Sequence, residues 1–379
     1  MKGRMFLVLL LLLFLFQTSV SAEEPEKESD YYDETFSSLG GEDFLEALPE
    51  EILELLQELG ITNPTPENLG RISFSDLLKV IGRMLKEAAA EPKQWMTLVL
   101  VASLFGVLFW QISSGTESLR PTFLLVFQGV VASVIALPVS DCILSAVERI
   151  KQISSLMKLL LPSLTAVLLG AGQSATAAIS GSFFSFCLTA GVEIFSVLLI
   201  PYLRMDLCFA LAGGFGEDHL CHLLSKIRKG VGGLFAGLVT LLIGLWNLQK
   251  SVSVAADSVA LRTGKAALSG MIPVVGGSLS EALAGMSGCV LLVKSCMGGL
   301  MLLTLFFLFF PLFAKVAVSL FVLWAGECLS EALGAKELAS FFGAVMGNLR
   351  LLLGVLAAVF AFLLLTIGTL LSSSMLSLG

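Results

Sequence analysis

The sequence predicts an all-α, polytopic membrane protein, and three observations lead to this prediction. Hydrophobic residues make up 56% of the 379 positions and charged residues only 14%. In soluble domains, by contrast, roughly a quarter of the residues are charged. The mean hydropathy of the chain is also high, at +0.91. The apolar residues also gather into runs that approach the roughly 20 residues a helix needs to cross a bilayer, and we expect about 7–8 spans.

The expected spans follow one another along most of the chain. They lie at 95–112, 122–144, 159–178, 182–203, 230–248, 288–310, 312–325 and 351–371. Between them, 147–158 and 249–270 mix charged and apolar residues as an amphipathic surface helix does, and 327–350 is a polar connector. We therefore divide the chain into a signal peptide (1–22), an exported segment (23–93), two first spans (94–145) and two membrane units (146–248 and 249–379).

The first 22 residues have the features of a cleavable signal peptide. Lys2 and Arg4 precede an apolar run at 5–16, and small residues at 20–22 suit a signal peptidase. An uncleaved anchor is the alternative, although the apolar run is too short to span comfortably.

Residues 23–93 form an acidic segment, with 18 acidic against six basic residues, whereas 94–379 holds 12 against 15. After a disordered leader at 23–38, apolar residues recur at helical spacing from Phe44 and stop at Gly60, and Ser73 can cap a second helix ending before Pro92. Signal cleavage would place this short helical segment outside the cytoplasm. Its apolar faces could pack on each other or on a partner.

The sequence MIPVVGGSLSEA at 271–282 interrupts apolar sequence with helix-breaking residues. Pro273 removes a backbone donor, and Gly276 and Gly277 allow a bend or a close approach. Because broken backbone at membrane depth must be buried or line a wet cavity, we expect a pathway segment here, with Glu281 beside it. An interfacial helix start with ordinary small-residue packing is the alternative.

A second segment, LLPSLTAVLLGAGQSA at 160–175, resembles the first and indicates a possible internal repeat. Pro162 and Pro201 are followed by Pro273 and Pro311 at offsets of 111 and 110 residues. Paired interrupted segments build central sites in transporter-like folds, so Pro162, Gly170 and Gly172 join the candidate pathway residues. Coincidence in low-complexity apolar sequence is the alternative.

Two charged residues lie inside otherwise apolar runs. Glu193 is near the middle of 182–203 and Lys294 interrupts 288–310. An isolated charge there costs at least about 2.5–3.5 kcal/mol, which indicates a partner or a wet pathway. Alternatively, each lies nearer a span end and reaches the interface by snorkelling.

Other site chemistry is weakly represented. His219, Cys221 and His222 are ligand types without a recognised zinc spacing, so we predict no metal and no cofactor. Protease, hydrolase and nucleotide-binding motifs are missing, which argues against an enzyme. The seven cysteines lie in or beside apolar stretches and suit small hydrophobes, and no basic tract with interleaved aromatic residues suggests nucleic-acid binding.

The signal peptide, the acidic segment, 160–175, 271–282 and the closing apolar span together resemble the stage III sporulation protein AE family of endospore-forming bacteria. The similarity runs from about residue 95 to the end and is most specific at 271–282. It implies a multi-pass protein of the mother-cell membrane around the forespore, belonging to a channel or secretion-like complex that supports forespore development and late gene expression. The implied partners are other stage III membrane proteins, a secretion-type ATPase and a forespore protein meeting them in the intermembrane space.

Three functional hypotheses follow. A conducting component predicts that Glu193, Glu281 and Lys294 face water. A membrane scaffold role predicts that charge-reversing substitutions of these residues have no effect on function. It also predicts that replacing Gly276 or Gly288 with a larger residue prevents assembly. A stand-alone secondary transporter is supported by the repeat and would be made in vegetative cells.

Overall fold

A computed structural model describes residues 28–61, 65, 68–69, 72–112, 120–213, 218–271 and 276–372. These residues are mainly helical, as predicted, and no strand occurs among them. The expected disordered leader at 23–38 is an exception, because residues 28–38 form a helix that buries Tyr32 and Phe36. The helices are α2 (Glu28–Ser38), α3 (Gly41–Glu46), α4 (Glu50–Glu58), α6 (Phe74–Ala88), α7 (Ala90–Ile112), α8 (Arg120–Gly170), α9 (Ser174–Ile194), the π-helical segment η2 (Phe195–Leu199), α10 (Ile200–Gly213), α11 (Asp218–Met271), α12 (Gly276–Ala332) and α13 (Lys336–Ser372). The predicted signal peptide lies outside the described residues.

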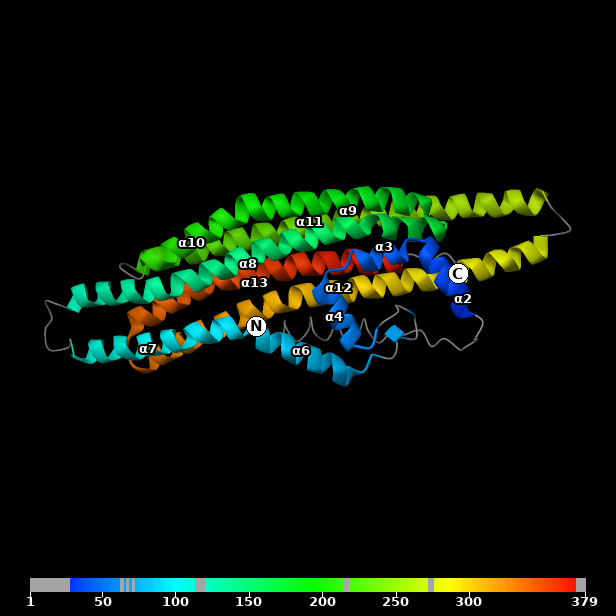
Figure 1. The fold of residues 1–379 in the computed structure, drawn as a ribbon. Coiled ribbons are helices and arrows are strands. Elements are labelled where there is room, and N and C mark those ends of the chain that lie inside the picture. Colours follow the sequence, from blue (N-terminus) through cyan, green and yellow to red (C-terminus); the bar gives the residue numbers. More distant parts are fainter. Residues whose placement is uncertain are drawn as a thin grey trace.

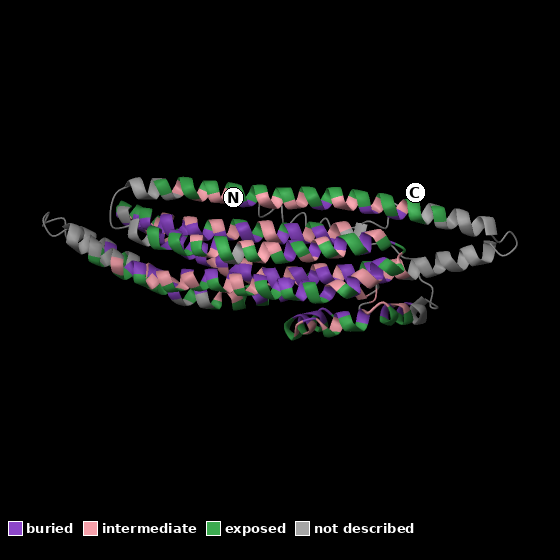
Figure 2. Ribbon diagram, turned by 90° about the horizontal axis from the view of Figure 1, so that it is seen from above, coloured by how far each residue is buried: buried purple, intermediate pink, exposed green. Residues whose placement is uncertain are grey.

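The long helices α8 to α13 run back and forth in one elongated bundle, with α12 and α13 between the α9–α11 pair and the N-terminal helices (Figure 1). Purple, buried positions concentrate in its interior, whereas α11 shows long exposed stretches (Figure 2). The core is rich in large apolar side chains such as Phe307, Phe309, Phe341 and Phe342. Lipid is as apolar as these side chains, so in a bilayer it is their close packing, and not their removal from water, that holds the helices together.

Several predicted boundaries fall inside continuous helices. The expected spans 122–144 and 159–178 and the surface helix 147–158 lie largely within α8, and spans 288–310 and 312–325 lie within α12. Pro138 and Pro162 sit inside α8 and Pro311 inside α12. Neighbouring helices can compensate for the lost backbone hydrogen bond, so these prolines do not end the helix. Each pair of expected spans therefore belongs to one continuous helix in the structure.

Within the described residues, five helices are long and apolar enough to cross a membrane. They are Gly129–Gly170, Ser174–Ala210, Ser225–Ala260, Val290–Ala332 and Leu338–Thr369. The expected spans that the structure joins within α8 and α12 account for part of the difference from 7–8, and that count stays a prediction. The helix α8 alone has 51 residues, about 77 Å at 1.5 Å per residue, and so exceeds a hydrocarbon core of about 30 Å.

The turn between α8 and α9 lies nine residues beyond Pro162. Gly172 adopts φ +73° there, in the left-handed region that glycine enters without a steric penalty. The first predicted interrupted segment therefore folds as a helical hairpin, broken at its glycine and not at its proline. The internal repeat itself stays a prediction.

Two ends of the N-terminal helices lie where the sequence predicts them. The left-handed Gly60 follows α4, and the Ser73 hydroxyl accepts a hydrogen bond from the Ser75 N–H at 3.3 Å at the start of α6. The predicted single apolar helix is divided at Pro49 into α3 and α4. Proline cannot donate the backbone hydrogen bond that a continuous helix would require there.

The same helices share a hydrophobic core with α8 and α12. Tyr32, Phe36 and Phe44 are buried in it together with Met157 and Met297. Burial, with a smaller contribution from the neighbouring Cys296, raises the pKa of the Tyr32 phenol. The acidic segment therefore packs along the bundle through its apolar face and leaves its carboxylates outside.

Candidate functional site

Asp206, Arg228 and Asn348 form a buried polar cluster, called here the Asp206 cluster, that joins three helices. The Arg228 Nε–H donates to both Asp206 carboxylate oxygens at 2.9 Å. The Asn348 amide donates to the same carboxylate and to the Leu203 carbonyl, each at 2.8 Å. Because these residues come from α10, α11 and α13, the cluster fixes the mutual position of those helices.

The surroundings of the cluster are tightly fitted. The Arg228 guanidinium lies against Gly347, where any Cβ would collide with it. Tyr202 Oη, Arg228 Nη2 and Asn348 Oδ1 are buried without a hydrogen-bond partner among the described protein atoms. Such a network in low dielectric is costly to disrupt, because removing one partner strands the others.

A second set of polar contacts holds the turn between α8 and α9. The Lys294 ammonium on α12 donates to the Gln173 side-chain carbonyl at 3.1 Å, and the side chains of both residues are buried. Asp257 on α11 accepts from the Ala175 and Thr176 N–H groups at 2.8 and 3.0 Å and from the Thr176 hydroxyl at 2.5 Å. A carboxylate at a helix N-terminus accepts from the free N–H groups and interacts favourably with the helix dipole. Asp257 of α11 therefore caps α9, in place of the residue that precedes the helix, Gln173.

Uncharged stretches of three helices separate these two sets of contacts. Residues 230–249 of α11, 295–314 of α12 and 351–370 of α13 contain no Asp, Glu, Lys or Arg, and we call this part of the bundle the apolar belt. Each stretch has 20 residues, about 30 Å of helix, which matches the thickness of a hydrocarbon core.

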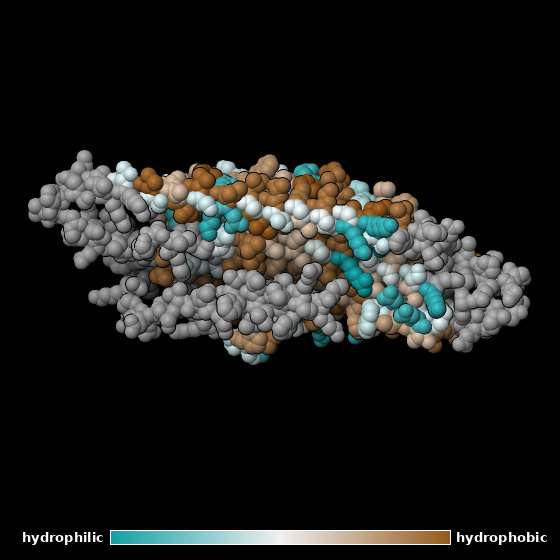
Figure 3. All heavy atoms as spheres, turned by 180° about the vertical axis from the view of Figure 1, so that it is seen from behind, coloured by the Kyte–Doolittle hydropathy of each residue, from teal (hydrophilic) through white to brown (hydrophobic). Residues whose placement is uncertain are grey.

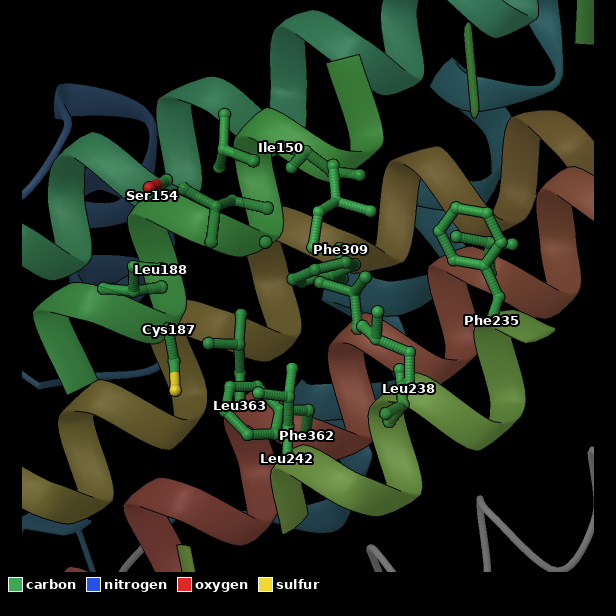
Figure 4. A pocket seen from close by; sticks show the side chains of 17 residues that line it. Ile150, Ser154, Cys187, Leu188, Phe235, Leu238, Leu242, Phe309, Phe362 and Leu363 are labelled. Carbon is green, nitrogen blue, oxygen red and sulfur yellow. The ribbon is translucent and has the colours of Figure 1, made fainter. Parts of the chain in front are cut away.

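The interior of the belt holds a cavity of about 70 Å³ (Figure 4). Its walls come from α8, α9, α11, α12 and α13 and include Phe235, Phe309 and Phe362, while Ser154 adds a hydroxyl. Apolar cavities of this kind stay dry because water finds too few polar partners in them. This cavity thus offers packing space with little polar lining.

The contacts described at these sites hold and orient helices. Within the described residues, no group of three or more His, Cys, Asp or Glu side chains is placed to bind a metal ion. The side chains of His219, Cys221 and His222 lie outside the described part. The prediction that the chain is not an enzyme stays a prediction.

The structure brings Lys294 to the predicted interrupted segment 160–175, whereas Glu193 lies at a separate place on α9. Pro162 and Gly170 are exposed on α8, and a Cβ at Gly170 would approach the Leu39 side chain to 2.9 Å. Glu193 is exposed on α9 and Lys294 is buried. Lys294 therefore lies in the bundle interior, bonded to a residue of the other predicted interrupted segment, and does not snorkel.

The remaining predicted residues belong to 271–282. Pro273 lies outside the described residues. Gly276, Gly277 and Glu281 fall in the first turns of α12, and their side chains are not described. The predicted interruption coincides with the link between α11 and α12, so its proposed role in a pathway stays a prediction.

Sequence reasoning missed the Asp206 cluster. The sequence prediction placed Asn348 in the connector 327–350 and did not single out Asp206 or Arg228. A usable signal was present, since Asp206 is an acid inside the otherwise apolar 205–213. Its partners are 22 and 142 residues away, a separation that helical periodicity cannot resolve.

Comparison with known proteins identifies the family of the chain. Residues 61–374 match the family described as stage III sporulation protein AE. The chain belongs to this family. Stage III sporulation protein AE of Bacillus subtilis (strain 168) is 23% identical over 154 residues, which is 40% of this chain and 39% of that protein. The chain thus aligns with well under two thirds of this curated relative, and no solved structure matches it.

Proposed function

We propose that this chain is a multi-pass membrane component of a channel or secretion-like complex that links the mother cell and the forespore during sporulation. It would lie in the mother-cell membrane around the forespore, with its N-terminal helices in the intermembrane space. Other stage III membrane proteins, a secretion-type ATPase and a forespore protein would be its partners. The family match over 61–374, which includes most of the described bundle, carries this proposal.

The geometry supports a role in an assembly. The longest helices have 51 to 57 residues, so they extend well beyond a hydrocarbon core of about 30 Å and can reach partners in the adjoining compartments. Brown, hydrophobic surface covers much of the described upper edge of the molecule (Figure 3), where lipid or other membrane helices would lie. The acidic N-terminal helices add a polar surface at one side of the bundle.

The dry cavity bears on how such a component could act. A conducting role would place the path on the outside of the bundle, between this chain and its neighbours. A scaffold that never contacts a path remains the second candidate, favoured by the Asp206 cluster, which stabilises a fixed arrangement. A secondary transporter would need a polar site at mid-depth, and the belt cavity is mainly apolar.

The proposal is tested by removing the gene from the sporulating host and restoring it. We expect deletion to stop forespore development and late forespore gene expression, and full-length protein to restore both. A fluorescent fusion should gather around the forespore, and the tagged chain should co-purify with stage III proteins. Normal spore formation without the gene, or steady production in vegetative cells, would contradict the proposal.

A further inference from the structure

Two flanks of the bundle lie at the same height but differ in chemistry. Residues from α8 (Ile150, Ile153) and α11 (Leu238, Leu242) line the same cavity, so these parts of the two helices are level with each other. They also lie inside the apolar belt, because 230–249 of α11 belongs to it. The outward faces of α8 and α11 can therefore be compared at one depth.

The outward face of α8 at this height is polar, and we call it the α8 flank. Its exposed residues recur at helical spacing and bracket the cavity-lining positions; they are Glu148, Lys151, Gln152, Ser155 and Lys158. The inward face of the same turns carries the buried Ile150, Ile153 and Met157. The amphipathic stretch predicted at 147–158 is therefore present, but it forms part of the long helix α8, which runs along the bundle.

The outward face of α11 at this height is apolar, and we call it the α11 flank. Leu234 is 66% exposed, Leu241 60% and Leu245 45%. These residues also bracket the cavity-lining positions of their helix. Leucines this exposed, repeated along a 20-residue uncharged stretch, suit contact with lipid.

The contrast has a direct energetic consequence. A charged side chain costs about 2.5–3.5 kcal/mol or more at the centre of a bilayer, so charged residues in membrane segments face protein or water. The α8 flank carries three charged side chains that are exposed in this chain. If the α11 flank lies in hydrocarbon, the α8 flank cannot lie in it as well.

We propose that the α8 flank faces water at the depth where the α11 flank faces lipid, so that the bundle forms a wall between the bilayer and a hydrated path. This proposal rests on the proposed function, because a path outside a single bundle requires neighbouring subunits to close it. Glu148 and the two lysines give the wall both signs of charge.

The N-terminal helices support this orientation. Helices α2, α4 and α6 pack against α12, and α4 and α6 lie on the side of the bundle away from α11 (Figure 1). Helix α3 packs against α8, and Glu51 on α4 lies 3.6 Å from Arg149, the neighbour of the α8 flank. Exposed acids such as Glu42, Glu50 and Glu54 could not be placed in lipid. The side that carries these helices is therefore the hydrated one, and it would open to the intermembrane space in which the proposed function places them.

The test compares cysteines on the two flanks at matched height. S155C and L241C are made separately in the full chain, and membranes from sporulating cells are permeabilised so that a charged maleimide reaches both sides. Peptide mass spectrometry assigns the label to each site, so the native cysteines do not interfere. A membrane-soluble maleimide measures the total reactive thiol. K151C and L245C repeat the comparison if either first variant fails to accumulate.

We expect the charged reagent to label the α8 flank at least about tenfold faster than the α11 flank, because only a hydrated thiol ionises and reacts readily. Equal, fast labelling would mean that this height lies outside the bilayer. Equal, slow labelling would mean that the α8 flank is dry. Either result would overturn the proposal.

Spore yield from the same strains separates this inference from the proposed function. A path-facing α8 flank together with a chain that is dispensable for sporulation would refute the proposed function and leave the orientation intact. A requirement for the chain together with equal labelling would refute the orientation alone.

Discussion

At one end of the apolar belt, Asp206 bonds to a guanidinium and an amide, whereas at the other end Asp257 bonds mainly to the N–H groups that begin α9. Both carboxylates are buried. The first is held by side chains from two other helices, so its loss would disturb tertiary packing. The second completes a helix end, so its loss would be felt first in the local turn. The comparison shows that similar buried acids can differ in what they stabilise.

The largest expected effect comes from removing the cation of the Asp206 cluster. R228M should destabilise the folded protein by about 3–5 kcal/mol, because it leaves the Asp206 carboxylate buried without its charge partner. Thermal unfolding of detergent-solubilised protein measures this loss. K229M changes an exposed neighbour and should alter the midpoint little. Similar midpoints for the two variants would contradict the importance of the cluster.

The space for the guanidinium provides the next test. G347A should cost about 1–3 kcal/mol, because the added methyl group displaces Arg228 and overpacks the site. G354A is the matched control on the same helix, since a Cβ at Gly354 meets nothing within 4 Å. It should be neutral or slightly stabilising. If combining G347A with R228M adds the full separate losses, the two residues do not act on one contact.

The α9 cap should contribute less than the charge cluster. D257A removes three hydrogen bonds from the start of α9 and should cost about 1–2 kcal/mol, as cap removal does elsewhere. Hydrogen exchange should show faster exchange at Ala175 and Thr176 with little change around Asn348. S258A is the control on the neighbouring position of α11. Uniformly faster hydrogen exchange across the bundle would mean that the cap does not act locally.

The smallest expected effect belongs to the exposed pair between α4 and α8. E51Q should change stability by less than about 1 kcal/mol, because the Glu51 side chain is 74% exposed and water screens the pair. E50Q on the same helix serves as the control, with limited proteolysis of the N-terminal helices as the measurement. Release of these helices by E51Q alone would show that the pair, and not the apolar core, holds them.

The sequence was sufficient for the helical class, the membrane character, the Ser73 cap and the stop at Gly60. These depend on composition and on contacts within a few residues. It was insufficient for the helix joins at Pro138, Pro162 and Pro311, because packing from distant helices decides whether a proline ends a helix. The Asp206 cluster was missed for the same reason, since its members are close only after α10, α11 and α13 have packed.

The contact between Tyr32 and α12 has a consequence during synthesis. Tyr32 leaves the ribosome early, but Cys296 beside it is made 264 residues later. At roughly 5–20 residues per second, translation takes on the order of tens of seconds to supply that surface. The part of Tyr32 that packs on α12 stays uncovered through this interval, while the other helices enter the bilayer. We expect the exposed acids beside it, such as Asp33 and Glu34, to keep this side chain in solution until α12 is complete.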